Sequence, residues 1–229
     1  MIKAIIFDFD GVIVESVDIK TKAFDRLFEH EGGVVVEKVV DYHPKNGGVP
    51  RFDKFRYYYK EILKRPLSDQ QFEELCSGFS ELVMEEVVKA PYVKGSKEIL
   101  DNYSRIYQCF VATGTPQEEI DEIIIQRGMV SYFKGVFGAP KKKSAIAREI
   151  LDAHCLKPDE VIFVGDAMSD YQAASENSIR FIARIHDNES IFRGIECIKI
   201  MDLTDLGRII NEEADIGQTA GLYSTNSVS

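Results

Sequence analysis

The 229-residue sequence lacks the features of several protein classes. No apolar run approaches the roughly 20 residues that a membrane-spanning helix needs, and acids interrupt the start where a signal peptide would be apolar. We therefore expect a cytoplasmic protein without a membrane partner. The four cysteines are scattered and form no CxxC pair, which argues against both a zinc site and a disulfide framework.

The sequence also has no basic stripe, and its formal net charge is −10. We therefore expect no nucleic-acid partner, because binding to a phosphate backbone needs a positive surface. The composition, 45% hydrophobic and 29% charged, is typical of a soluble globular protein, which we expect to be a monomer or a weak homo-oligomer. Any phosphate site must be built locally, from a metal ion, backbone amides and a few placed cations.

Four short apolar runs each end in a polar loop, as buried strands do at the edge of a sheet. They are Ala4 to Phe7 before DFDG, Ile106 to Ala112 before TGTP, Val136 to Phe137 before GAP, and Val161 to Val164 before GD. Two further strands are predicted at Arg180 to Arg184 and Cys197 to Met201. Helical patterns follow some of the runs, as at Ile120, Ile123 and Ile124. This alternation predicts an α/β fold with a doubly wound parallel sheet, whose ligands bind where the strands end.

The alternation is interrupted between residues 16 and 90, where apolar and aromatic residues follow helical spacing. We predict a helical cap of three or four helices at 16–90, inserted into a core formed by 1–15 and 91–216. The loop from Tyr42 to Arg51, rich in glycine and proline, should be exposed and adaptable. Residues 217–229 are small and polar and should form a poorly ordered tail.

Asp8 and Asp10 directly follow the first predicted strand, and Gly11 allows the chain to turn there. Two carboxylates brought close together repel each other unless a cation or a shared proton intervenes. Mg²⁺ suits such a pair, because it accepts one or two carboxylates and completes its shell with water and phosphate oxygens. An acidic turn in which Asp10 only caps the next segment is the alternative.

Four patterns occur in a fixed order along the chain: FDFDGV at 7–12, apolar-Thr-Gly at 112–114, lysines at 141–143, and GDxxxD at 165–170. Together they resemble the haloacid dehalogenase-like superfamily, in particular its phosphatases and β-phosphoglucomutase-like members. The resemblance extends from Ile5 to about Ala183 and implies a Rossmann-like core with a helical cap inserted between the first two motifs. The first and last motifs are specific, whereas the middle two are weak when taken alone.

The resemblance implies a role for each carboxylate. Asp8 would be the nucleophile that forms an aspartyl-phosphate. Asp10 would protonate the leaving group and then deprotonate the hydrolytic water. Asp8, Asp10 and Asp166 would hold Mg²⁺, and Asp170, about one helical turn after Asp166, would orient its waters or a lysine.

The middle motifs would bind the phosphoryl group. Thr113 and the Gly114 amide would contact its oxygens, although Thr113 alone could be an ordinary strand residue. One lysine of the cluster should turn inward, and the GxPxxK spacing favours Lys143 over Lys141. A solvated charge run is the alternative for all three lysines.

Substrate selection should depend on the predicted cap. Gly48 to Arg51 resembles a Gly-Val-x-Arg segment of hexose-phosphate mutases and phosphatases in this superfamily, so Arg51 with Lys45 could meet an anionic part of the substrate. Ordinary helix-surface charge is the alternative. Lys20 stands where those mutases carry a histidine, which counts against a mutase.

These residues predict a Mg²⁺-dependent phosphatase acting on a small phosphorylated metabolite, such as a sugar phosphate. A sugar phosphomutase would use the same two aspartates. A C–P bond hydrolase would need a cap lysine with a depressed pKa, for which Lys45 is the candidate. A binding protein without catalysis is the remaining alternative, and it would leave the whole set of reactive residues idle.

Overall fold

A six-stranded sheet forms the centre of the fold in the computed structural model, which describes residues 1–186 and 191–212. The predicted tail at 217–229 lies outside these residues. All strand pairings are parallel, and the order across the sheet is β3-β2-β1-β4-β5-β6. The strands are β1 (Ala4–Phe7), β2 (Gln108–Pro116), β3 (Gly135–Ala139), β4 (Val161–Gly165), β5 (Arg180–Arg184) and β6 (Ile198–Ile200). The predicted doubly wound α/β fold is confirmed.

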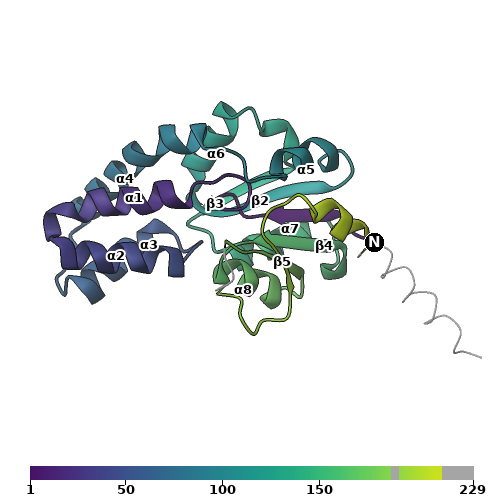
Figure 1. Ribbon diagram of the computed structural model, residues 1–229. Helices are drawn as coiled ribbons and strands as arrows, with labels where there is room; N and C mark the ends of the chain where they lie inside the picture. The colour runs from purple at the N-terminus through teal and green to yellow at the C-terminus, as the bar shows by residue number, and fades with distance from the viewer. Residues whose placement is uncertain (187–190, 213–229) are drawn as a thin grey trace, which may run out of the picture.

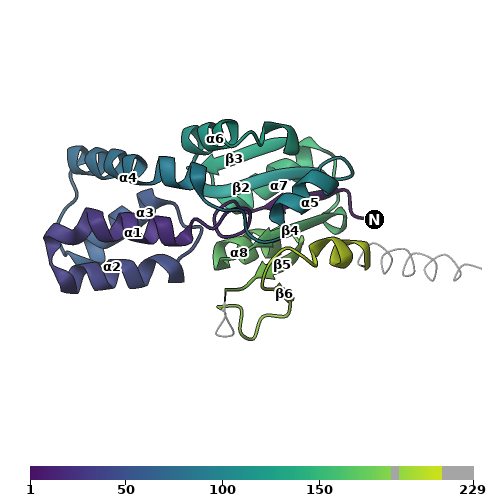
Figure 2. The same cartoon turned by 45° about the horizontal axis from the view of Figure 1, so that its top comes forward.

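Helices cover both faces of the sheet because side chains alternate along each strand. In β1, Ile5 and Phe7 belong to one hydrophobic cluster, whereas Ala4 and Ile6 belong to the other. The first cluster includes α5 and α6, and the second includes α7 and α8, so the two pairs lie on opposite faces (Figure 2). Their bounds are α5 (Ser96–Tyr103), α6 (Gln117–Gln126), α7 (Lys143–Ala153) and α8 (Met168–Glu176).

Four α-helices between β1 and α5 extend away from the sheet (Figure 1). They are α1 (Val17–Phe28), α2 (Gly33–Lys45), α3 (Arg51–Tyr57), which continues into a π-helical turn at Tyr58–Ile62, and α4 (Asp69–Lys89). Their shared core is aromatic, with Phe24 in contact with Phe55, Tyr58 and Phe79. We refer to residues 17–89 as the helical segment. Its role as a separate cap domain with limits at 16 and 90 stays a prediction.

The loop predicted as exposed between Tyr42 and Arg51 differs from that prediction. Helix α2 continues to Lys45. Residues 46–50 are half-buried at the side of the helical segment that faces the sheet. Gly48 has φ +68°, and a Cβ there would lie 2.8 Å from the Lys143 ammonium. Glycine therefore lets this backbone approach the end of the sheet more closely than a residue with a side chain could.

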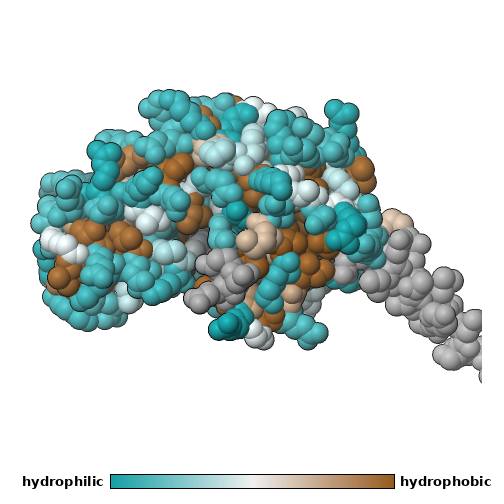
Figure 3. Space-filling model, in the orientation of Figure 1, coloured by the Kyte–Doolittle hydropathy of each residue, from teal (hydrophilic) through white to brown (hydrophobic). Residues whose placement is uncertain are grey.

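The face seen in Figure 3 is mostly hydrophilic, as expected for a chain with 29% charged residues. A smaller apolar area lies over the end of the helical segment farthest from the sheet, and Val34 is exposed at the start of α2. Over residues 1–186 and 191–212, no helix has the length and apolar character required to cross a bilayer. The cytoplasmic location stays a prediction.

Candidate active site

Asp8 follows the last residue of the central strand β1 and is 2% exposed. Its amide continues the ladder by donating to the Val164 carbonyl of β4 at 2.9 Å, which places Asp8 between the two halves of the sheet. The Phe9 amide donates to Asp8 Oδ1 at 2.7 Å, and the Lys143 ammonium lies 2.7 Å from Oδ2. Both carboxylate oxygens are therefore held in a fixed orientation, at the switch point where such sheets bind ligands.

Burial raises the pKa of the Asp8 carboxyl well above its usual range, against the opposing charge of Lys143. The carboxylates of Asp170, Asp166 and Asp10 add to the increase. A carboxylate in this position is stabilised by further positive charge. The site is thus suited to a cation in addition to Lys143.

Lys143 begins α7 and is buried between two aspartates. Its ammonium lies 2.7 Å from Asp8 Oδ2 and 2.6 Å from Asp170 Oδ1. Burial alone would lower the pKa of Lys143, but the charges and hydrogen bonds of Asp170 and Asp8 raise it overall. Lys141, the alternative from the sequence, is exposed and bonds to Glu149 instead. The structure thus places Lys143 in the site and Lys141 outside it.

Replacement of Lys143 should destabilise the folded protein, because its charge balances two buried carboxylates. In Lys143→Met two buried carboxylates lose their shared cation, and we expect the free energy of unfolding at pH 7 to fall by about 3 kcal/mol. Burial already raises the pKa of Asp170 to about 6. A carboxyl whose pKa is raised by folding binds its proton more tightly in the folded state, so stability is lost as the pH rises through that pKa.

The deficit of Lys143→Met should therefore be smaller at pH 5 than at pH 7. Urea titrations in chelator at the two pH values measure it, and Lys141→Met is the matched control that should change stability little. Equal deficits for the two variants, or a deficit of Lys143→Met that does not depend on pH, would contradict the arrangement.

Three carboxylates are grouped where β1 and β4 end. One oxygen from each of Asp8, Asp166 and Asp170 lies within 4.8 Å of the others. Both oxygens of Asp170 are already bonded, to Lys143 at 2.6 Å and to the Ala167 amide at 3.1 Å. Asp170 is fully buried and does not line the pocket, whereas Asp8 and Asp166 do, so these two are the members best placed to offer oxygens to a divalent cation. His186, for which no role is predicted above, lies 3.0 Å from Asp166 Oδ2.

Gly11 allows β1 and β4 to place their carboxylates this close together. Its φ is +73°, and a Cβ at this position would lie 2.1 Å from Asp166 Oδ2. Any larger residue would strain the turn and displace the Asp166 carboxylate. The glycine of the DFDG motif therefore contributes directly to the acidic group.

The Asp10 carboxylate, predicted as a metal ligand, is not part of this acidic group. It accepts hydrogen bonds from Ser16 Oγ at 2.6 Å, Lys20 Nζ at 2.5 Å and Thr115 Oγ1 at 2.9 Å. Burial raises the pKa of Asp10, but the charge of Lys20 and these hydrogen bonds outweigh it and lower the pKa overall. Asp10 is therefore held ionised beside Asp8, with its charge balanced by Lys20.

The residues predicted to bind phosphate lie at the end of β2, beside β1. Thr113 is 1% exposed, and its hydroxyl lies 3.4 Å from Asp10 Oδ2. Gly114 is in close contact with the loop at 46–50, since a Cβ on Gly114 would lie 2.6 Å from the Gly48 carbonyl oxygen. Both residues line the same pocket as Asp8 and Asp10.

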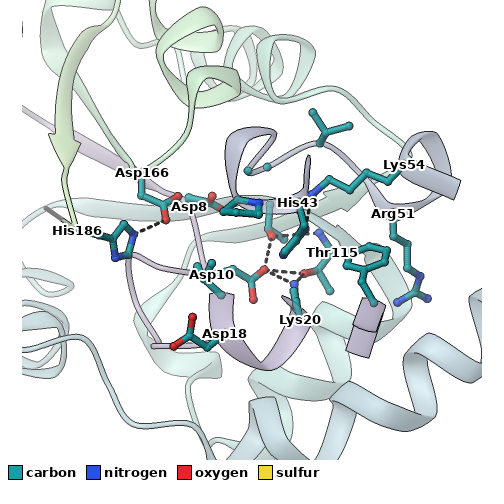
Figure 4. Close-up of a pocket in the computed structure, with 18 of the residues that line it drawn as sticks. Asp8, Asp10, Asp18, Lys20, His43, Arg51, Lys54, Thr115, Asp166 and His186 are labelled. Atoms are coloured by element: carbon teal, nitrogen blue, oxygen red, sulfur yellow. Dashed lines mark hydrogen bonds and ion pairs between the residues drawn. The ribbon is translucent and has the colours of Figure 1, made fainter. Parts of the chain in front are cut away.

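This pocket has a volume of about 520 Å³ and lies between the strand ends and the helical segment. Figure 4 shows Asp8 and Asp166 on one side and Lys54 and Arg51 on the opposite side. A space of this size suits a small metabolite.

The two cap residues predicted for substrate contact differ from expectation. Lys45 does not line the pocket; it is exposed and pairs with Asp41 one helical turn earlier. The structure thus places Lys45 outside the pocket, because α2 continues to Lys45 and directs it along the helix surface, and its contact with substrate stays a prediction. Arg51 lines the pocket, but its guanidinium binds Glu119 of α6 through both terminal nitrogens and Ser80 at 2.8 Å.

Sequence analysis missed three pocket residues that the helical segment contributes. Lys20 bonds to Asp10, and the Lys54 ammonium lies 2.7 Å from His43 Nδ1. Lys54 follows Arg51 by three residues, a spacing that places both on one face of α3. That spacing was a usable signal, whereas His43 lies on a different helix and had none.

Comparison with known proteins points in one direction. Residues 5–184 match the family model described as haloacid dehalogenase-like hydrolase. Phosphoglycolate phosphatase of Aliivibrio fischeri is 28% identical over 183 residues, which cover 76% of this chain and 79% of that protein. Phosphorylated carbohydrates phosphatase of Thermotoga maritima is 29% identical over 189 residues, which cover 79% of this chain and 83% of that protein. The structure of β-phosphoglucomutase from Clostridium difficile has a TM-score of 0.77 at 15% identity, and the match covers 96% of this chain and 100% of that one. At this identity the likeness is one of fold alone.

Proposed function

The chain belongs to the haloacid dehalogenase-like hydrolases, and from this premise we propose that it hydrolyses a small phosphomonoester through an aspartyl-phosphate on Asp8. The observation that carries the proposal is the environment of Asp8: a buried, oriented carboxylate beside one lysine, a second carboxylate and an acidic group. Relatives named as phosphatases of phosphoglycolate and of phosphorylated carbohydrates support a small phosphorylated substrate.

In the first step an Asp8 oxygen forms a bond to phosphorus while the bond from phosphorus to the ester oxygen breaks. Asp10 gives its proton to the departing oxygen. In the second step a water oxygen attacks the same phosphorus, Asp10 takes the proton of that water, and the bond to Asp8 breaks to release phosphate. The two steps regenerate both aspartates in their starting states.

The proton on Asp10 must be acquired before the first step, because Lys20 and the hydrogen bonds of Ser16 and Thr115 hold the free carboxylate ionised. A phosphate dianion entering beside Asp10 adds negative charge, which favours proton uptake there. In the second step the lowered pKa leaves Asp10 ionised, which is the form that can accept the proton of the water. Lys20 thus supports the hydrolytic half of the cycle.

The donor set fits Mg²⁺, which favours carboxylate oxygens and bound phosphate. Asp8 and Asp166 would hold the ion, since both line the pocket and Asp170 does not. When bound, Mg²⁺ neutralises charge on the transferring phosphoryl group. Lys143, Thr113 and the Gly114 amide would hold the remaining phosphoryl oxygens.

The alternatives taken from the sequence receive less support. A mutase would use the same two aspartates, so the ionised state of Asp10 fits both activities, and the relatives named as phosphatases favour hydrolysis. The C–P hydrolase alternative relied on Lys45, which lies outside the pocket, so this alternative would have to use Lys54, whose pKa burial lowers to about 7. Hydrolysis of a phosphomonoester therefore remains the best-supported function.

Asp10→Asn provides the test that separates the two aspartates. The amide cannot transfer protons, but Asp10 lies outside the acidic group, so metal affinity should persist. Esters with good leaving groups need little protonation on departure. We expect the variant to form the aspartyl-phosphate with an activated aryl phosphate and accumulate it, yet to lose sugar-phosphate hydrolysis by about 10²-fold or more.

Rapid quench with intact-mass measurement follows the intermediate, and isothermal titration with Mg²⁺ checks the metal site. The aryl phosphate serves as the internal control for folding and phosphate binding. If activated and unactivated esters are lost equally while metal affinity is intact, Asp10 is not the acid and base.

A further inference from the structure

Lys54 is a buried amine in the wall of the pocket. Burial and the charge of Lys20 lower the pKa of Lys54 to about 7, so an anion placed beside it would favour its charged form. Lys54 lies on α3, is 2% exposed, and bonds through its ammonium to His43 Nδ1 at 2.7 Å. Figure 4 shows it across the pocket from Asp166. It therefore faces the part of the pocket away from the acidic group, where the organic part of a phosphoester bound at Asp8 would extend.

The other cations around the pocket all have carboxylate partners. Lys143 pairs with Asp8 and Asp170, Lys20 with Asp10, and Arg51 with Glu119. Within residues 1–186 and 191–212, no carboxylate forms an ion pair with Lys54. A buried ammonium without an anion is costly, and a negatively charged ligand is what would compensate it.

His43 cannot supply that charge. Burial, together with the charge of Lys54, lowers the pKa of His43 to about 2, so the ring is neutral. Its Nδ1 accepts from Lys54, which leaves Nε2 as the protonated nitrogen. The pair therefore presents two donors, the Lys54 ammonium and His43 Nε2. Its acceptor, His43 Nδ1, is already bonded to Lys54, so the pair has no acceptor left for a ligand hydroxyl.

We propose that Lys54, supported by His43, binds a carboxylate on the organic part of the substrate, so that the enzyme selects small phosphorylated acids over phosphorylated alcohols and neutral sugars. This inference rests on the proposed phosphatase function. A single ammonium matches a singly charged carboxylate. A second phosphate would favour the forked guanidinium of Arg51, but Glu119 and Ser80 already occupy it.

Matched pairs of substrates test the selection. We would measure kcat/KM for 2-phosphoglycolate against ethyl phosphate, and for 3-phosphoglycerate against glycerol 1-phosphate, with Mg²⁺ present. A charged hydrogen bond in a buried site predicts that the wild-type enzyme prefers each acid by at least about tenfold. In Lys54→Met that preference, measured as the ratio of the two kcat/KM values, should fall to within about threefold, because only the acid loses its partner.

Lys60→Met is the matched control, since Lys60 is an exposed lysine that lies in the turn following α3 and does not line the pocket. It should retain the full preference. Hydrolysis of p-nitrophenyl phosphate, which carries no carboxylate, reports whether Lys54→Met keeps its fold and core chemistry.

The outcomes separate the two proposals. Absence of hydrolysis of every phosphate ester by the wild-type enzyme would count against the phosphatase function itself. If the wild-type enzyme hydrolyses the acids and the alcohols with equal kcat/KM, Lys54 does not select for a carboxylate. A greater kcat/KM for 1,3-propanediol bisphosphate than for 3-phosphoglycerate would show that Lys54 prefers a second phosphate to a carboxylate. A borohydride-stable adduct of an aldehyde phosphonate on Lys54 would assign that amine to covalent chemistry instead.

Discussion

Asp8→Asn is expected to abolish turnover of every phosphomonoester, with kcat at least about 10³-fold below that of the wild type. The side-chain amide is a far weaker nucleophile than a carboxylate. Its neutral charge also removes the anion that pairs with Lys143 and one of the oxygens suited to the metal. Each of these three effects acts on the chemical step, so no substrate should escape the loss.

The fold should survive the substitution, because asparagine has nearly the same shape and relieves repulsion within the acidic group. Thermal melting in chelator should therefore be unchanged or higher for Asp8→Asn. Asp152→Asn, the same substitution at an exposed position of α7, is the control and should retain full activity. Retention of a tenth of the activity by Asp8→Asn, with contaminating phosphatase excluded, would disprove Asp8 as nucleophile.

Removal of divalent metal should have an effect of similar size. We expect activity to disappear in chelator and to return with Mg²⁺, since burial, and after it the neighbouring carboxylates, raise the pKa of Asp8 despite the charge of Lys143, so that a further cation is needed to favour the carboxylate. Ca²⁺ should inhibit, because its larger and more variable coordination shell holds phosphate and carboxylate less strictly. Initial rates across a Mg²⁺ titration at constant ionic strength measure the effect.

Binding of the ion can be followed without turnover. A ligand that binds only the folded state raises the melting temperature, so Mg²⁺ should stabilise the wild type. That increase should be lost in Asp166→Asn and kept in Asp152→Asn. Full activity in chelator, or equal stabilisation of all three proteins, would show that the acidic group does not hold a catalytic metal.

The positions of the strand-end residues were predictable because each depends on a short stretch of sequence. An apolar run followed by a polar loop predicts a buried strand, and parallel strands bring their carboxyl ends to one edge. Asp8, Thr113 and Asp166 meet at that edge for this reason. Gly11 and the bonds of Asp170 then determine how closely the carboxylates approach, which no spacing rule specifies.

The helical segment was less predictable, since helical periodicity predicts which face is buried but not which partner it meets. His43 and Lys54 come from different helices, and their contact depends on how α2 packs against α3. Lys45 shows the same limit from the other side. Its proximity to the Gly-Val-Pro-Arg stretch in sequence suggested the pocket, whereas one more turn of helix placed it against Asp41.

The bond between Arg51 and Glu119 affects how substrate enters and product leaves. It connects α3 of the helical segment to α6 beside the sheet, and its two side chains are only 8% and 15% exposed. When these helices separate, both charges regain hydration, which largely offsets the lost attraction. Arg51 Nε, buried without a partner among the described residues, also regains a water contact. We therefore expect this contact to favour the observed arrangement of α3 and α6 only weakly, and to oppose their separation little.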